Sequence, residues 1–265
     1  MGWAFTLMRT SLRVIGQHRQ LVVFPIVSGV ATIAVIVATA LPVTGHGSSP
    51  VSWVVIAVGY FLLSLVTVFC NAALVHAANL ALRGERATVA AGFRGALARF
   101  GAIALWALIS CTVTLLLRAL SVVKLGELVE AILGLTWQLT TYLVIPLIVV
   151  ERDSVPTALR RSKDLLRRTW GTNLSGTAGI AVSLGLTALA GIAVLVGVGV
   201  LVNVLAHNAT AAFFVAGPAI ALWLVILIVL GGTISAVFRT ALYRFAADGT
   251  TVPQFREIDL GTTFD

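Results

Sequence analysis

The feature that most constrains this chain is a series of long apolar runs that carry almost no charge. Each run has about 20 residues or more, the length that an α-helix needs to cross the hydrocarbon core of a bilayer. Short charged segments separate the runs. The pattern predicts an all-α, polytopic transmembrane bundle of about six helices, with spans at about 21–41, 51–79, 101–120, 129–150, 176–205 and 212–238.

Composition excludes a water-soluble fold. Of the 265 residues, 59% are hydrophobic and 11% are charged, and the mean hydropathy is +1.03. A soluble domain carries roughly 25% charged residues, so this chain could not cover a water-exposed surface. We therefore expect residues 1–250 to form a single integral membrane domain and residues 251–265 to be a short cytoplasmic tail.

The basic residues predict an orientation. Sixteen of the 18 lysines and arginines fall in the segments on one side of the predicted spans, and only Arg118 and Lys124 fall on the other. The positive-inside rule places both termini in the cytoplasm. We expect the membrane to be the plasma membrane of a prokaryote. The formal charge of +8 is spread over short segments between apolar runs. It therefore indicates contact with anionic lipid and no nucleic-acid partner.

Three basic segments read as amphipathic helices on the cytoplasmic side of the membrane. They cover residues 1–20, 83–99 and 156–170, and each precedes a predicted transmembrane hairpin, so the pattern is that of a repeated unit. In the third segment, Ser154 can cap the helix and Pro156 suits its first turn. Its basic side chains are candidate contacts for anionic lipids: Arg160, Arg161, Lys163, Arg167 and Arg168.

Polar residues inside the spans form a candidate intramembrane site. Its members are Gln138, Thr141 and Tyr142 in the fourth span, with Asn71 and His76 in the second. Polar groups in a dry environment must find partners, so they should face other helices or a wet cavity. We favour hydrogen bonds between helices as their role, and a route for a substrate or a proton is the alternative.

A separate set of small residues predicts close helix packing. Gly171, Ser175, Gly179 and Ser183 recur every fourth residue at the start of the fifth span. Small residues at this spacing let another helix approach closely, either from the same chain or from another subunit. Gly231 and Ser235 repeat the pattern in the sixth span.

Motifs for catalysis, metals and cofactors are missing from the sequence. It contains no nucleophile elbow, phosphate-binding glycine loop, His-Glu-x-x-His motif or intramembrane pair of acids. Cys70 and Cys111 lie in apolar runs without the spacing of a disulfide framework or a zinc site. We therefore expect no catalytic residues, no metal and no cofactor.

Several motifs are shared with a family of multi-pass membrane proteins. They include Asn71-Ala72-Ala73-Leu74, Val144-Ile145-Pro146, Ala158-Leu159-Arg160-Arg161-Ser162 and Leu165-Leu166-Arg167-Arg168-Thr169-Trp170-Gly171. On these residues the chain resembles an uncharacterised bacterial and archaeal family, a domain of unknown function. The Ala-Leu-Arg-Arg-Ser helix is also similar to one in the membrane domain of some glycerophosphodiester phosphodiesterases. The resemblance implies six helices with interfacial segments, and no phosphodiesterase activity.

These observations favour a non-enzymatic role. We expect an accessory subunit or an organiser of lipids and proteins in the membrane, with anionic lipids as ligands and a protein partner or a homo-oligomer as its assembly. The alternative is a small transporter or permease for a lipid-like or small solute, using the polar stretch from Thr136 to Tyr142. A membrane-embedded enzyme ranks third. A continuous polar cavity that reaches Gln138 would favour transport.

Overall fold

The computed structural model describes residues 16, 19–46, 50–120, 126–206 and 209–248. The side chains of residues 166–180, and of a few residues near helix ends, lie outside the description. So do most of the predicted amphipathic helix at residues 1–20 and all of the predicted tail at 251–265. The described elements are η1 (Arg19–Val22), α2 (Val23–His46), α3 (Pro50–Leu82), α4 (Val89–Leu97), α5 (Phe100–Leu120), α6 (Gly126–Thr140), α7 (Val144–Val149), α8 (Val155–Ala206) and α9 (Ala209–Asp248).

All regular structure in the described residues is helical, and it contains six helical stretches long and apolar enough to cross a membrane. These stretches cover residues 19–40, 50–82, 100–119, 128–149, 181–204 and 216–244. Each overlaps one of the six predicted spans. The protein is therefore an all-α, multi-pass membrane protein, as the sequence predicts.

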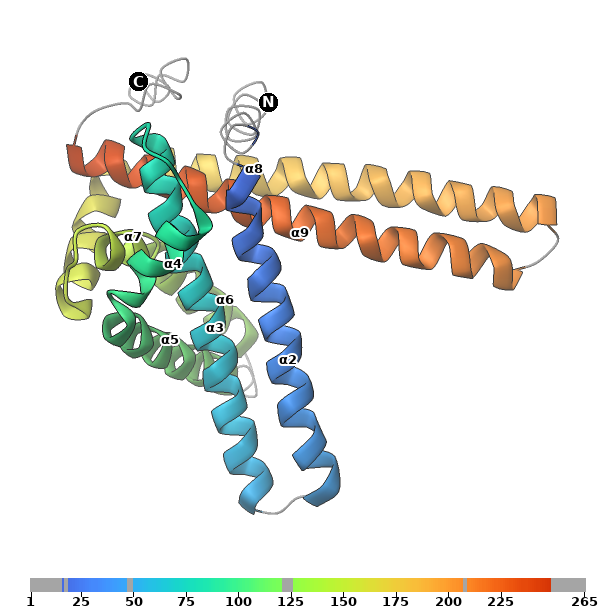
Figure 1. Ribbon diagram of the computed structural model, residues 1–265, viewed down its shortest axis with the longest axis horizontal. Helices are drawn as coiled ribbons and strands as arrows, with labels where there is room; N and C mark the ends of the chain where they lie inside the picture. The colour runs from blue at the N-terminus through green and yellow to red at the C-terminus, as the bar shows by residue number, and fades with distance from the viewer. Residues whose placement is uncertain (1–15, 17–18, 47–49, 121–125, 207–208, 249–265) are drawn as a thin grey trace.

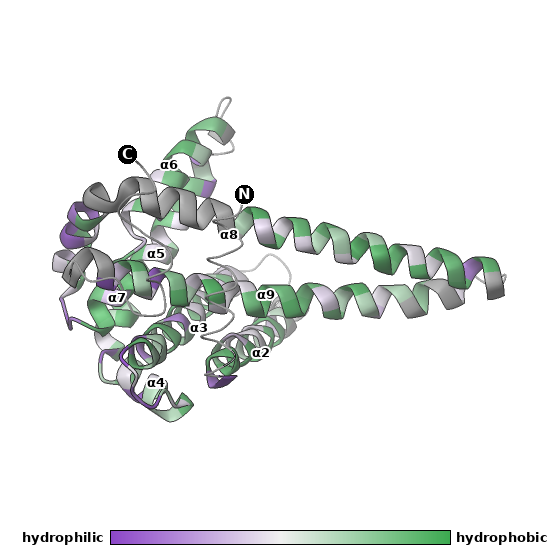
Figure 2. Cartoon of the chain, turned by 90° about the horizontal axis from the view of Figure 1, so that it is seen from above, coloured by the Kyte–Doolittle hydropathy of each residue, from purple (hydrophilic) through white to green (hydrophobic). Residues whose placement is uncertain are grey.

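The helices form a compact part with two arms (Figure 1). The compact part, which we call the hub, consists of α4, α5, α6 and α7 with the adjoining ends of α3, α8 and α9. The α2–α3 hairpin makes one arm and the α8–α9 hairpin makes the other, and the arms leave the hub in different directions. Hydrophobic residues dominate the α8–α9 arm, while hydrophilic residues gather around the hub (Figure 2). Large apolar side chains on both arms are exposed, among them Ile33, Trp53, Leu189 and Phe213. Such surfaces are suited to lipid.

Most of the buried core lies in the hub, where the ends of the long helices meet. The second half of α3 is its centre, because Ala72, Ala73 and Val75 are fully buried there. Aromatic pairs connect the surrounding elements. The Phe24 and Phe93 rings lie 5.1 Å apart, and the Trp106 and Trp137 rings stack at 5.8 Å.

Glycines allow the helices of each arm to approach closely. A Cβ on Gly59 of α3 would lie 2.6 Å from Cγ2 of Thr39 on α2. In the α8–α9 arm, a Cβ on Gly191 would lie 2.1 Å from Nε1 of Trp223, and one on Gly231 would lie 2.9 Å from Cδ1 of Leu184. The helix pairs therefore use small residues where their neighbours are bulky.

The fourth predicted span is broken into two helices at residues 141–143. Pro146 has no N–H, so it cannot continue the α-helical hydrogen bonds across the break. Ser162 of α8 forms hydrogen bonds with two backbone groups at the break. Its hydroxyl donates to the carbonyl oxygen of Thr140 at 2.6 Å and accepts from the backbone N–H of Leu143 at 3.3 Å. A single buried hydroxyl thereby fixes α8 against the break.

The basic helix predicted at 156–170 and the fifth span are one continuous helix, α8. The sequence analysis treated them as separate pieces, and the structure corrects this division. No proline lies between them, and glycines such as Gly171 and Gly176 each cost a helix only about 1 kcal/mol relative to alanine. The long helix packs against α7 and α9.

Candidate functional site

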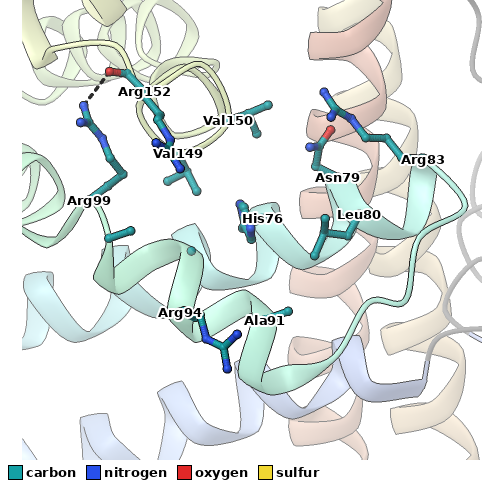
Figure 3. Close-up of a pocket in the computed structure, with 12 residues that line it drawn as sticks. His76, Asn79, Leu80, Arg83, Ala91, Arg94, Arg99, Val149, Val150 and Arg152 are labelled. Carbon is teal, nitrogen blue, oxygen red and sulfur yellow. Dashed lines mark hydrogen bonds between the residues drawn. The ribbon is translucent and has the colours of Figure 1, made fainter.

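A cavity of about 450 Å³ opens at the hub, on the side where α3 ends. Its walls come from the end of α3, from α4 and the two residues after it, Ala98 and Arg99, and from the end of α7 with the turn that follows. Figure 3 shows His76 and Asn79 of α3 between Arg99 and Arg152 on one side and Arg83 on the other. Four arginines line this cavity, which we call the basic pocket: Arg83, Arg94, Arg99 and Arg152.

Helix α4 forms one wall because its sequence lets it pack directly on α3. Thr88 caps the helix, accepting a hydrogen bond from the backbone N–H of Ala91 at 3.1 Å. A Cβ on Gly92 would lie 2.8 Å from the carbonyl oxygen of Ala73, and one on Gly95 would lie 2.3 Å from the His76 ring. These two glycines bring α4 against α3 and hold the imidazole at the floor of the pocket.

The opposite wall is the turn that joins α7 to α8. The Arg99 guanidinium donates hydrogen bonds to the carbonyl oxygens of Ile148, Arg152 and Asp153 at 3.3, 2.7 and 2.9 Å. It thus satisfies carbonyl groups at the end of α7. Arg152 lies in this turn with a φ of 61°, a left-handed conformation that is uncommon outside glycine.

A second set of contacts fixes the same turn from the α8 side. Arg161 pairs with Asp153 at 2.9 Å and with Glu151 at 3.8 Å, and the Tyr243 hydroxyl donates to Glu151. Burial lowers the pKa of Arg161. The hydrogen bond to Asp153 and the nearby negative charges raise it by a larger amount, so the pKa lies above its ordinary value. The Arg161 guanidinium is therefore engaged in ion pairs within the protein.

The basic pocket has positive charge and polar groups without partners. Arg83, Arg94 and Arg152 are exposed, and no carboxylate of the described residues forms an ion pair with any of them. At the floor, Asn79 is only 4% exposed. Its Oδ1 and the Nδ1 of His76 are buried without a hydrogen-bond partner in the described part of the chain. Buried polar groups usually have partners, so this floor is built to receive a polar ligand or water.

The predicted intramembrane site is divided among separate cavities. Gln138, Thr141 and Tyr142 line one of about 580 Å³, Asn71 lines another of about 230 Å³, and His76 belongs to the basic pocket. Arg239 of α9 lines both of the first two cavities. The structure therefore groups the three residues of the fourth span and separates them from His76.

Arg239 is a residue whose place the sequence analysis missed. The sixth span was expected to end at Phe238, with Arg239 as a flanking charge. Instead α9 continues to Asp248, and Thr240, Leu242 and Tyr243 are buried in the hub. The Arg239 guanidinium lies over the Tyr142 ring at 4.5 Å from its centroid, and its Nε is buried without a hydrogen-bond partner in the described chain.

The other predicted site residues are placed as follows. Arg160 and Lys163 are exposed on α8, as lipid contacts require, whereas Arg161 is committed to the ion pairs with Asp153 and Glu151. Ser183 of the packing ridge is buried at 5% exposure. The remaining predicted residues lie on α8, but their side chains are outside the described residues: Arg167, Arg168, Gly171, Ser175 and Gly179.

The arginines of the basic pocket were visible in the sequence only as orientation charges. Arg83, Arg94 and Arg99 were counted together with every other basic residue near the membrane. The spacing Gly92-Phe93-Arg94-Gly95 could have indicated a short helix packed closely on a neighbour. Nothing in the sequence indicated that Arg152 would face His76 across the pocket.

Comparison with known proteins agrees with an uncharacterised family. The sequence model of a family of unknown function, DUF6159, matches residues 50–253. No curated protein and no solved structure matches the chain. The comparisons add no support for the likeness to the membrane domain of glycerophosphodiester phosphodiesterases. Because the match covers more than half of the sequence, including every element of the basic pocket, the chain belongs to the DUF6159 family.

Proposed function

We propose that this protein is a non-enzymatic membrane protein that gathers anionic lipids at the cytoplasmic face of a prokaryotic plasma membrane. One observation carries the proposal. Three arginines without carboxylate partners among the described residues line the same pocket as two buried polar atoms without partners, at the end of a candidate membrane span. The phosphate of a lipid headgroup suits the arginines, because arginine is suited to binding phosphate, and Asn79 Oδ1 can accept a hydrogen bond from a headgroup hydroxyl such as those of phosphatidylglycerol.

The position of the pocket supports a membrane ligand. His76 and Asn79 belong to the last two turns of α3, which is itself a candidate membrane span. In the proposed orientation this end of α3 lies at the cytoplasmic surface, the depth of lipid phosphates. Each basic residue close to an anionic membrane surface contributes about 1 kcal/mol. The exposed Arg160 and Lys163 on α8 add to the same attraction.

A transport function is less well supported. The basic pocket and the cavity at Gln138 share no lining residue. Both are lined by α3 and by α7, and the basic pocket also uses Arg99, just before the α5 helix that lines the other cavity. Between their lining positions lie the fully or almost fully buried Val75, Ile103 and Ile148. Packed apolar side chains of this kind do not form a continuous polar route. We therefore place transport second.

Lipid retention tests the proposal. The protein is purified in a nonionic detergent and given an equimolar mixture of phosphatidylglycerol and phosphatidylcholine, and retained lipids are counted by native mass spectrometry. We expect the parent to retain phosphatidylglycerol preferentially. The double variant Arg83→Gln/Arg152→Gln should lose this preference, because the loss of about 1 kcal/mol per arginine lowers the affinity for phosphatidylglycerol by about thirtyfold.

The matched control removes the same charge elsewhere. Arg19 and Arg86 are exposed and do not line the pocket. The Arg19→Gln/Arg86→Gln variant should keep the preference of the parent. Equal losses in the two double variants would show that only the total charge attracts lipid, and the pocket would then have no role in binding.

A further inference from the structure

Arg239 is a charged residue in a candidate membrane span, and it does not line the basic pocket. The residue lies within the candidate span 216–244, one helical turn before Tyr243. A charged side chain inside a membrane protein is expensive unless it is paired, and it marks a functional site by default. No carboxylate of the described residues forms an ion pair with Arg239, and its Nε lacks a hydrogen-bond partner.

The contact with Tyr142 satisfies only part of this requirement. A guanidinium over an aromatic ring gains a cation–π attraction of about 0.5 to 2 kcal/mol. That contact uses none of the five N–H donors of the group. Donors at the edge of the guanidinium can still bind two oxygens of one anionic group, which is the geometry of arginine with carboxylate or phosphate.

The cavity beside Arg239 has the character of a site for an amphiphile. It measures about 580 Å³, within the range of small-molecule sites. Gln138, Ser110 and Tyr142 provide polar groups near the single cation. The rest of the wall is apolar, and includes Val68, Trp106, Leu135, Leu139 and Ile145. A ligand that fits must therefore combine one anionic group with a hydrocarbon chain.

We propose that this cavity binds a single-chain amphiphilic anion, with its carboxylate or phosphate on Arg239 and its hydrocarbon chain against the apolar wall. The site is separate from the basic pocket, because the two cavities have no residue in common. It also gives the residues predicted from the fourth span, Gln138, Thr141 and Tyr142, a shared role as the polar surroundings of the headgroup.

The test measures binding of tritiated oleate to the protein in nanodiscs of zwitterionic phosphatidylcholine, at alkaline pH where the acid is ionised. We expect oleate to bind the parent at one saturable site. Loss of a charge-assisted hydrogen bond in Arg239→Gln should weaken binding by about tenfold to a hundredfold. Unlabelled oleate should displace the label, while oleyl alcohol should not. Dodecyl phosphate as competitor reports whether the site also accepts phosphate.

Two further variants keep the proposal falsifiable if Arg239→Gln fails to fold. Ser110→Phe fills the cavity from α5 without removing the cation, so it should abolish oleate binding while the protein remains folded. Arg83→Gln/Arg152→Gln alters only the basic pocket, so its oleate affinity should equal that of the parent. Displacement by oleyl alcohol as efficient as by oleate, or parent-like oleate binding in Arg239→Gln or Ser110→Phe, would overturn the proposal.

Discussion

Arg152 combines a strained backbone conformation with one of the positive charges of the basic pocket. Its φ of 61° is unfavourable for a side chain with a Cβ, by roughly 1 to 2 kcal/mol. The strain is maintained because Arg99 binds the carbonyl oxygens on both sides of the turn and Arg161 binds Asp153. Strained residues that their surroundings hold in place are concentrated at functional sites. Here the strained conformation directs a guanidinium toward His76.

This arrangement predicts opposite changes in stability and binding for Arg152→Gly. Glycine adopts positive φ without the steric cost, so the free energy of unfolding should stay the same or rise by up to about 1 kcal/mol. Loss of the guanidinium should reduce the preference for phosphatidylglycerol. Thermal unfolding in detergent and native mass spectrometry measure the two effects. A variant that is less stable than the parent but retains as much phosphatidylglycerol would contradict both parts.

Among the elements, α4 decides the shape of the basic pocket although it has only nine residues. Gly92 and Gly95 bring it so close to α3 that a backbone carbonyl and an imidazole occupy the space of a side chain. The Phe24 ring also packs over Gly92, so α2, α3 and α4 meet at one point. This contact makes α4 a rigid wall rather than a loose interfacial helix.

We therefore predict that Gly92→Ala destabilises the protein by about 1 to 3 kcal/mol, the usual scale of overpacking. The new Cβ would meet the carbonyl oxygen of Ala73 and the Phe24 ring, and a backbone carbonyl cannot move aside cheaply. Gly185→Ala in α8 is the control, because its Cβ would meet nothing within 4 Å. Alanine is the better helix former, so Gly185→Ala should stabilise slightly or have no effect. Equal melting temperatures for the two variants would show that α4 does not pack as tightly as described.

Comparison of elements shows what could be predicted from the sequence. The six spans follow from run length and hydropathy, which depend only on local composition. The break at 141–143 was not predicted, since its free backbone groups are satisfied by Ser162, about 20 residues later. Arg239 was assigned to the water phase because a charge at the end of an apolar run usually marks the membrane surface. The buried residues after it, including Leu242 and Tyr243, depend on tertiary packing.

The basic pocket illustrates the same limit. Asn79, Arg99 and Arg152 come from three segments far apart in the sequence, and no periodicity connects them. The positive-inside rule counts each arginine equally, whereas the structure uses Arg99 to hold a turn, Arg161 to pair with carboxylates and Arg83 to line a cavity. The number of basic residues on each side of the membrane predicts orientation, whereas the contacts of each arginine depend on tertiary structure.

At the scale of the whole molecule, polar residues gather around the hub and apolar residues dominate the α8–α9 arm (Figure 2). The hub contains α7 and the ends of α3 and α9 (Figure 1), and four arginines line its basic pocket. The arms extend from it as apolar hairpins whose turns lie far from the hub. The 52 residues of α8 rise about 78 Å, which exceeds the roughly 30 Å of a hydrocarbon core, so part of this helix must lie outside the membrane.

The final prediction concerns which side of the membrane each end of the molecule faces. Sixteen basic residues on one side and two on the other predict that the part of the hub that holds the basic pocket faces the cytoplasm. The two arm tips should then both face the opposite side, since each arm is a hairpin of two spans. Single cysteines at Pro50 and Thr210 report the tips, and single cysteines at Arg86 and Lys163 report the hub. The background is Cys70→Ala/Cys111→Ala, which removes the two buried native thiols.

Intact cells are treated with a membrane-impermeant maleimide, and the same cells are treated again after lysis. Pro50→Cys and Thr210→Cys should be labelled in intact cells, whereas Arg86→Cys and Lys163→Cys should be labelled only after lysis. Both hub positions are exposed, so failure to label them in intact cells would reflect the membrane barrier and not burial in the protein. Labelling of the hub but not of the tips in intact cells would invert the orientation. It would also place the basic pocket away from the cytoplasmic leaflet, and the proposed lipid-binding function would then lose its basis.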